Sequence, residues 1–424
     1  MKIIQDPARS EWPELLTRPA FDMLPLEKKV RKILEKVRKD GDKAVKKFTK
    51  EFDGSKVKNL VVTSKEIKEA ISEVPDALKH AIRLAKSNIE KFHSSQLQTT
   101  EYIETMPGVR CWRNSVGIEK VGLYIPGGTA PLFSTVLMLG IPAKMAACKE
   151  IVLCSPPQSN GKLHPAVLFA AAEVGITTII KAGGIQAIGA MGYGTESIPQ
   201  VYKIFGPGNQ YVTCAKQLLQ AEGVAIDMPA GPSEVCVLAD QSADASFIAA
   251  DLLSQAEHGP DSQVLLVTTD AALAKKVEKE IEMQVALLPR KKIAMQALEN
   301  TKLVVLPDIN AAIELVNAYA AEHLIIACEN DEAIARKILN AGSVFLGNYS
   351  PESAGDYASG TNHALPTNGY AKCYSGVSLD SFVKKITYQK LTKHGLENIG
   401  TAVMEMAEAE GLQAHARAVS IRLV

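Results

Sequence analysis

The chain has 424 residues and carries 47 Lys and Arg against 47 Asp and Glu, so its formal net charge is zero. This balance removes the electrostatic argument for a nucleic acid or an anionic membrane as partner. Hydrophobic residues make up 46% of the chain, too many for a disordered protein. The length predicts two or more domains.

The pattern of cysteines and apolar segments predicts a cytoplasmic protein without a membrane span. The 7 cysteines are scattered and form no CxxC pair, which indicates reduced thiols. The first residues lack the apolar core of a signal peptide. The uncharged stretch 121–143 is divided by Pro126, Pro131 and Pro142 into strand, turn and helix.

Hydrophobic periodicity predicts the elements in chain order. Helical patterns cover 26–48 and 64–92, and short apolar runs then alternate with helical ones. The expected strands are 121–125, 151–154, 177–180, 201–205, 234–238, 263–267, 303–306 and 324–327. The expected helices between them are 134–148, 164–174, 245–258, 271–288 and 310–320. Apolar strands separated by helices are typical of parallel sheets, so the predicted fold class is α/β.

The two series of strands predict two incomplete Rossmann-like parallel-sheet modules with amino- and carboxyl-terminal helical extensions. The expected units are an extension over 1–24, a larger domain of 25–117 with 236–377, a second domain over 118–235, and an extension over 378–424. Helical patterns at 379–389 and 396–418 make the last extension helical. With little partner surface of its own, it is expected to dock elsewhere or on another subunit.

Four clusters of polar residues are candidates for chemistry. Gln255 and His258 share one face near a helix end, which is either half of a zinc site or a simple helix cap; the spacing alone favours the cap. Glu322 and His323 offer two proton-transfer groups before an apolar strand, and reach one substrate only if the chain turns there. The alternative is that Glu322 and His323 form a solvent-exposed polar junction between a helix and a strand.

The other two clusters lie near the carboxyl terminus. The loop 353–366 carries Asp356 and His363, and loops of this length without secondary structure are usually functional or disordered. Glu410 and His415 follow on the last predicted helix, where an ordinary surface helix is the default interpretation. Cys154 ends a strand, but no base accompanies it in the sequence, which favours a buried structural thiol over a nucleophile.

Three glycine-rich turns, 125–128, 182–186 and 206–209, follow predicted strands of the second module. Their backbone amides could meet a phosphate at a helix N-terminus, and open α/β sheets bind ligands at this edge. None of the turns has the G-x-G-x-x-G pattern of a standard dinucleotide site.

Taken together, these clusters resemble the histidinol dehydrogenase family. The segments that carry the resemblance run in the family's order and read VGLYIPGGTAPLFSTVLMLGIPA, KIFGPGN, AIDMPAGPSEV, DLLSQAEHGPDSQV, AEHLII and AGSVFLGNYSPESAGDYASGTNHALPT. They cover most of the chain and are long and specific. The helix that carries Glu410 and His415 has fewer of the family's motifs.

The resemblance implies a role for each candidate residue. The proton-transfer pair would be Glu322 and His323. The zinc ligands would be Gln255, His258, Asp356 and His415. The substrate would be bound by Ser233, Gln255, His258, His323, Asp356, His363, Glu410 and His415. The NAD contacts would be Tyr124, Gln186 and Asn209.

The implied reaction is the zinc-dependent, NAD-linked oxidation of L-histidinol to L-histidine through bound L-histidinaldehyde, the last step of histidine biosynthesis. The resemblance also implies a homodimer in which residues after 378 complete the partner's site. Manganese or cobalt would also accept the implied ligands. The alternatives are a dehydrogenase for another amino alcohol, a zinc hydrolase that uses the Glu322/His323 pair, and a nucleotide-binding protein without catalysis.

Overall fold

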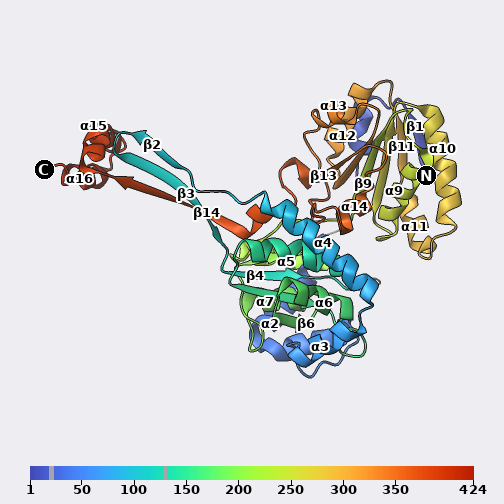
Figure 1. The fold of residues 1–424 in the computed structure, drawn as a ribbon, viewed down its shortest axis with the longest axis horizontal. Coiled ribbons are helices and arrows are strands. Elements are labelled where there is room, and N and C mark those ends of the chain that lie inside the picture. The colour runs from blue at the N-terminus through green and yellow to red at the C-terminus, as the bar shows by residue number, and fades with distance from the viewer. Residues whose placement is uncertain (19–22, 128–130) are drawn as a thin grey trace.

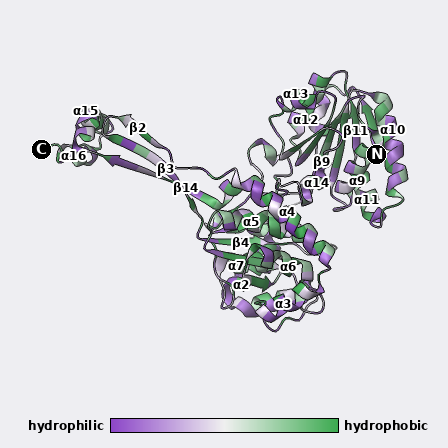
Figure 2. Ribbon diagram, in the orientation of Figure 1, coloured by the Kyte–Doolittle hydropathy of each residue, from purple (hydrophilic) through white to green (hydrophobic). Residues whose placement is uncertain are grey.

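The computed structural model describes residues 1–18, 23–127 and 131–424. Two parallel sheets with flanking helices form two bodies, and an antiparallel sheet extends from them as an arm that ends in two helices (Figure 1). Figure 2 shows that apolar residues concentrate in the strands of the two bodies, whereas outer helices such as α10 (Ala271–Val285) carry polar residues as well. The predicted α/β class is confirmed.

The first parallel sheet has the strand order β1-β11-β10-β9-β12-β13. Its strands are β1 (Lys2–Gln5), β9 (Glu234–Ala239), β10 (Gln263–Thr268), β11 (Lys302–Val305), β12 (His323–Ala327) and β13 (Ser343–Leu346). The flanking helices are α9 (Ala245–Ala256), α10, α11 (Lys291–Leu298), α12 (Ile309–Tyr319) and α13 (Asp331–Ala335).

The amino-terminal segment belongs to this sheet. Strand β1 pairs in parallel with β11, so residues 2–5 form an edge strand and not part of a helical extension. Within the described residues 1–18, one short helix, α1 (Trp12–Leu15), follows a turn of 3₁₀ helix. Residues 19–22 of the expected extension lie outside the described residues.

The second parallel sheet has the order β6-β5-β4-β7-β8. Its strands are β4 (Lys120–Tyr124), β5 (Glu150–Ser155), β6 (Thr178–Lys181), β7 (Lys203–Phe205) and β8 (Ala225–Ile226). Its helices are α5 (Phe133–Met145), α6 (Pro165–Val174), α7 (Gly184–Tyr193) and α8 (Gln210–Ala221). The predicted strands and helices of both series are therefore present, with shifts of a few residues at their ends.

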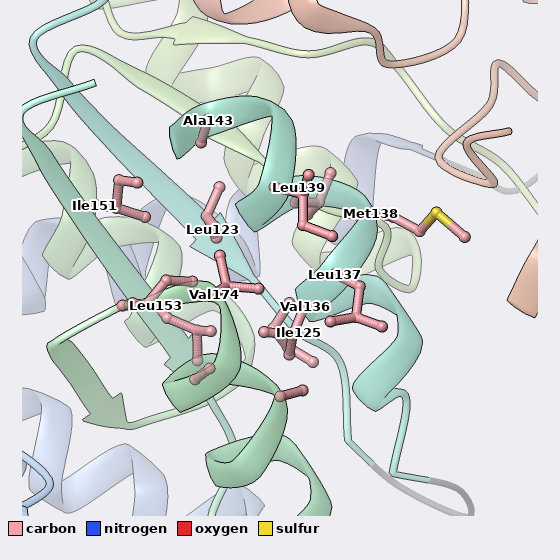
Figure 3. Close-up of a cluster of buried hydrophobic side chains, with 14 of the residues drawn as sticks. Leu123, Ile125, Val136, Leu137, Met138, Leu139, Ala143, Ile151, Leu153 and Val174 are labelled. Atoms are coloured by element: carbon pink, nitrogen blue, oxygen red, sulfur yellow. The ribbon is translucent and has the colours of Figure 1, made fainter. Parts of the chain in front are cut away.

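The uncharged stretch 121–143 is explained by burial. Strand β4 and helix α5 pack against each other through Leu123, Val136 and Leu139, with Ile151 and Val174 of neighbouring elements (Figure 3). A helix covered on all sides needs no polar face. No helix in the described part of the chain is long and apolar enough to cross a membrane.

The early helices pack on the second body, which differs from the expected grouping of 25–117 with 236–377. Helix α2 (Met23–Phe52) contacts α7 and α8, α3 (Ser64–Glu73) contacts α6, and α4 (Asp76–Ser94) contacts α5. The reason is their apolar faces: Val30, Leu34 and Val37 of α2 join the core around Ile188 of α7. Residues 23–94 therefore belong to the second body, because their apolar faces pack there.

The arm combines segments that are far apart in the sequence. Strand β3 (Val109–Gly117) lies between β2 (Tyr102–Met106) and β14 (Val383–Leu391), and both pairings are antiparallel. Helices α15 (Lys393–Ala409) and α16 (Gln413–Ser420) follow at its tip (Figure 1). The prediction of a helix over 379–389 is wrong, because the β-branched and aromatic run Ile386-Thr387-Tyr388 favours a strand once β3 offers a pairing edge.

Candidate active site

The chain turns sharply just before Glu322 and His323. Helix α12 ends at Tyr319, and its C-cap Ala320 adopts the left-handed conformation (φ 55°). As a result the two adjacent side chains meet on one side, and His323 Nδ1 lies 3.6 Å from Glu322 Oε2. Both side chains are buried. The turn on which a shared role depends is therefore present.

The backbone of Glu234, at the start of β9, holds both members of this pair. Its N–H donates to Glu322 Oε2 at 2.9 Å. Its carbonyl oxygen lies 3.2 Å from His323 Nδ1, and because a carbonyl only accepts, this nitrogen carries the proton. His323 Nε2 is thereby directed toward the remaining polar groups of the site.

Burial and charge shift the proton affinities of the pair. Burial raises the pKa of Glu322 to about 7, and the neighbouring His323 charge opposes this shift. Burial lowers the pKa of His323, but the carboxylates of Glu322, Asp356 and Glu352 outweigh it and raise the pKa above its usual value. A carboxyl group whose pKa lies near neutrality, next to an imidazole whose proton affinity is raised, forms a pair suited to general acid–base chemistry.

Several buried polar atoms on β12, α14 (Glu352–Tyr357) and α9 lack a hydrogen-bond partner within the described structure. Asp356, on helix α14, places Oδ1 3.3 Å from His323 Nε2 without the alignment of a hydrogen bond. Both amide atoms of the fully buried Gln255 are unpartnered, as is Glu352 Oε2. Such atoms cost free energy unless a ligand or water satisfies them, so this cluster is a candidate ligand site.

The described residues fit a metal site only in part. Gln255 lies in the last turn of α9 and His258 just beyond it, and the pKa of His258 is lowered by burial, which keeps the imidazole neutral as metal binding requires. Among the described residues no three His, Cys, Asp or Glu side chains are grouped to hold a metal ion. Of the four expected zinc ligands, the two bodies contain His258, Asp356 and Gln255. The side-chain oxygen of Gln255 has no hydrogen-bond partner.

The other two expected site residues lie far away in the same chain. Glu410 follows α15 and His415 is on α16, both at the tip of the arm and both exposed (Figure 1). One chain therefore does not bring them to the cluster around His323.

A cavity of about 570 Å³ is lined by residues of both bodies, and Glu322 of the pair is one of them. It brings together Ser233, His258, Glu322 and His363 from the expected site. His363 joins the two bodies, because its Nδ1 lies 2.8 Å from the Asp356 carbonyl oxygen and its Nε2 lies 3.2 Å from Thr135 Oγ1 on α5.

A second cavity of about 650 Å³ lies at the carboxyl edge of the second sheet and is lined by Tyr124 and Asn209. The Tyr124 hydroxyl accepts a hydrogen bond from the N–H of Gly184 at 3.1 Å. Asn209 caps α8 and lines the first cavity as well, so the two cavities are neighbours. Gln186 is buried behind the turn, and its side-chain amide donates to Asp53 Oδ2 at 3.3 Å.

Gly206 shows why small residues are needed at this edge. Its φ is +131°, and a Cβ there would lie 2.1 Å from the Tyr124 carbonyl oxygen. Residue 128 of the predicted turn 125–128 lies outside the described residues. The expected cofactor residues Tyr124 and Asn209 are therefore brought to one edge of the sheet.

Some residues of the site were not anticipated from the sequence. Arg18, Glu234 and Glu352 surround the Glu322/His323 pair, and Asp53 lies beside Gln186. The sequence signal for Glu234 was its position as a charged residue at the start of an apolar strand. The sequence contained no such signal for Arg18 or Asp53. Cys154 is buried, and burial raises the pKa of its thiol, so the interpretation as a structural thiol is confirmed.

Fold and site together define an α/β protein with a buried Glu/His pair, whose Glu322 lines a cavity between two parallel-sheet bodies. The family model described as histidinol dehydrogenase matches residues 16–423. The chain belongs to the histidinol dehydrogenase family, as the sequence resemblance indicated, and is therefore of an oxidoreductase family.

Similar proteins agree with this assignment. Histidinol dehydrogenase of Bacteroides thetaiotaomicron is 61% identical over 423 residues, which cover 100% of this chain and 99% of that protein. The chloroplastic histidinol dehydrogenase of Arabidopsis thaliana is 52% identical and covers 98% of this chain and 89% of its own. The crystal structure of histidinol dehydrogenase from Elizabethkingia anophelis superposes with a TM-score of 0.98 at 57% identity, covering 100% of this chain and 98% of that one.

Proposed function

We propose that this protein catalyses the last step of histidine biosynthesis in the cytoplasm. It oxidises L-histidinol to L-histidine through bound L-histidinaldehyde: L-histidinol, two NAD⁺ and water give L-histidine, two NADH and protons. The family supports the substrate, and the observation that carries the chemistry is the buried Glu322/His323 pair, whose Glu322 lines the cavity between the two bodies.

In the first oxidation, His323 accepts the proton of the substrate alcohol as the carbon gives up a hydride. The carboxylates of Glu322 and Asp356 raise the proton affinity of this imidazole in the free protein. The positive charge of a bound cation and of the substrate ammonium group would oppose that effect and leave Nε2 free to accept.

In the second oxidation, Glu322 removes a proton from a water molecule that attacks the bound aldehyde. The resulting hydrate then loses a hydride, and His323 again takes the hydroxyl proton. Burial has brought the pKa of Glu322 to about 7, a value suited to a base at neutral pH. Neither step uses a cysteine, which agrees with the buried state of Cys154.

The proposed metal ligands are Gln255, His258 and Asp356 of one chain and His415 of a second copy. The unpartnered amide of Gln255 and Oδ1 of Asp356 support this choice. Zinc in this position would supply a Lewis acid that orients the substrate's nitrogen atoms and retains the aldehyde. NAD⁺ supplies the hydride acceptor, and we assign it to the edge with Tyr124, Gln186 and Asn209.

A homodimer would explain why Glu410 and His415 lie on a projecting arm. An arm of three strands and two helices buries little apolar surface within its own chain. We propose that its tip reaches the partner subunit, where both side chains contact substrate and His415 contacts the metal.

The experiment that tests the function is NADH formation from L-histidinol, with and without a chelator, by the wild type and His323→Asn. Two NADH per histidinol, with loss of activity on chelation, is the expected result. A single NADH with accumulating aldehyde would contradict the second oxidation. Faster NADH formation from another amino alcohol would favour a related dehydrogenase, and no NADH at all a zinc hydrolase.

A further inference from the structure

A buried ion pair lies next to the catalytic pair, and its Arg18 side chain lines the same cavity as Glu322. Arg18 holds the carboxylate of Glu234 in a bidentate arrangement, with Nε 2.5 Å from Oε1 and Nη2 2.9 Å from Oε2. The side chain of Glu234 is 2% exposed and that of Arg18 is 14% exposed. Planar guanidinium groups are preferred for such two-point contacts, which lysine cannot make.

Arg18 also fixes the segment that leads into the catalytic pair. Its Nη2 donates to the Tyr319 carbonyl oxygen at 2.7 Å, and its guanidinium lies 4.1 Å from the centroid of the Tyr319 ring. Tyr319 is the last residue of α12, three positions before Glu322. Arg18 therefore joins the start of β9 to the end of the helix from which the catalytic pair follows.

The link to the chemistry is the backbone of Glu234. Its N–H holds the carboxylate of Glu322 and its carbonyl oxygen holds the imidazole of His323. The side-chain carboxylate of Glu234 accepts hydrogen bonds from the guanidinium of Arg18 and from the N–H of Asn368, the latter at 2.8 Å. If the guanidinium is removed, a buried carboxylate is left without its counter-charge, and the residue that aligns both catalytic groups must move or protonate.

We propose that Arg18 is a positioning residue, which aligns Glu322 and His323 through Glu234 and through the end of α12. This inference rests on the proposed function, since it assigns those two residues the proton transfers. It also gives the amino-terminal segment a part in the reaction, although that segment supplies no catalytic group. The guanidinium acts on the rate of the chemical steps more than on substrate binding.

The test uses the full-length variants Arg18→Ala and Arg18→Lys, with Arg9→Ala as the matched control. Arg9 lies in the same segment and pairs with Glu314 at 2.5 Å, but both side chains are at least half exposed. For each protein we would measure kcat and KM with L-histidinol, the thermal unfolding midpoint, and the effect of millimolar guanidinium on kcat.

The expected result is a selective loss of kcat. Misplacement of catalytic groups by about 1 Å costs roughly 100-fold in rate, so kcat of Arg18→Ala should fall by about that factor while KM changes less than about threefold. The kcat of Arg18→Lys should fall about tenfold, because the lysine ammonium can replace only one of the two contacts with the Glu234 carboxylate. Added guanidinium should restore part of the kcat of Arg18→Ala and leave Arg9→Ala unchanged.

Other outcomes would overturn the inference. A folded Arg18→Ala with wild-type kcat, or a loss that guanidinium does not reverse and that matches a lower fraction of folded protein, would show a purely structural role. If Arg18→Ala does not fold, Arg18→Lys decides alone, and a kcat equal to that of Arg9→Ala would refute the proposal. A wild type that does not oxidise histidinol would overturn the proposed function and this inference together, whereas an active wild type with unchanged Arg18 variants would overturn this inference alone.

Discussion

The imidazole Nδ1 of His363 lies 2.8 Å from the backbone carbonyl oxygen of Asp356. The nitrogen donates to this oxygen, so Nε2 is the acceptor and faces Thr135 and the cavity. Burial lowers the pKa of His363 below its usual value, which keeps the ring neutral. Nε2 accepts from the Thr135 hydroxyl, and a substrate donor would take the place of that hydroxyl.

His363→Asn should therefore weaken substrate binding. We expect the KM for L-histidinol to rise about tenfold, which corresponds to the loss of one hydrogen bond, with a smaller change in kcat. His80→Asn is the control, because His80 makes a similar bond to the Asp76 carbonyl oxygen on an exposed helix face. Steady-state kinetics check the prediction, and an unchanged KM would remove His363 from the substrate site.

Mixed dimers test whether two subunits share one active site. His323→Asn and His415→Asn homodimers should each lose activity by about 100-fold or more if both residues serve the site. After the two are unfolded and refolded together, hybrid dimers should recover activity, because one of their two sites has both residues intact. Co-refolded mixtures that remain as inactive as the separate variants would contradict a shared site.

Metal content tests the ligand set. Purified wild type should contain about one zinc ion per subunit, and His258→Asn should contain much less, since a lost ligand typically costs at least tenfold in affinity. A chelator should lower the unfolding midpoint of the wild type but not that of His258→Asn. The exposed His394 is the control position. Equal zinc in both proteins by elemental analysis would exclude His258 as a ligand.

Two substitutions of Asn209 separate stability from cofactor binding. Asn209 Oδ1 accepts the N–H groups of Tyr211 at 3.1 Å and Val212 at 3.2 Å, which caps helix α8. Asn209→Asp keeps this cap, whereas Asn209→Ala costs about 1 kcal/mol of folding stability. Both should raise the KM for NAD⁺, because the amide donor is lost in each. A normal KM in Asn209→Asp would place the cofactor elsewhere.

The carboxyl of Asp53 should make stability depend on pH. Burial raises its pKa to about 6, against a usual value of 3.8. The folded protein then binds this proton more tightly than the unfolded chain, so the stability it contributes at low pH is lost as the pH rises through 6. Asp53→Asn should gain stability over the wild type between pH 4 and pH 7, about the interval between the two pKa values.

Unfolding midpoints at both pH values measure this difference. Glu51→Gln is the matched control, because Glu51 is exposed at the end of the same helix, α2. A constant difference between Asp53→Asn and the wild type across this interval would contradict the assignment.

Much of the fold was predictable because buried strands and helices have distinct patterns. The apolar runs of β5, β9 and β10 identify parallel strands covered on both faces. Strands β1 and β14 were not predicted, because a short edge strand and a solvent-exposed strand have no continuous apolar run. Their structure depends on partners distant in the sequence.

The candidate site was predictable only where its residues lie in recognisable sequence motifs. The spacings around Gln255 and Glu322 located candidate chemistry, but each left a structural alternative open, and the family resemblance was needed to choose between them. The roles of Arg18 and Glu234 arise from contacts across more than 200 residues. Such contacts follow from packing of the bodies, which local patterns do not contain.

The arm has a consequence for how the chain matures during synthesis. Strand β3 is made early, but its neighbour β14 follows only after most of both bodies, and the pairing covers all nine residues of each strand. Until then β3 exposes one unpaired edge, a feature that promotes association with other strands. The arm can therefore be completed only after residues 383–391 have been made, long after its first two strands.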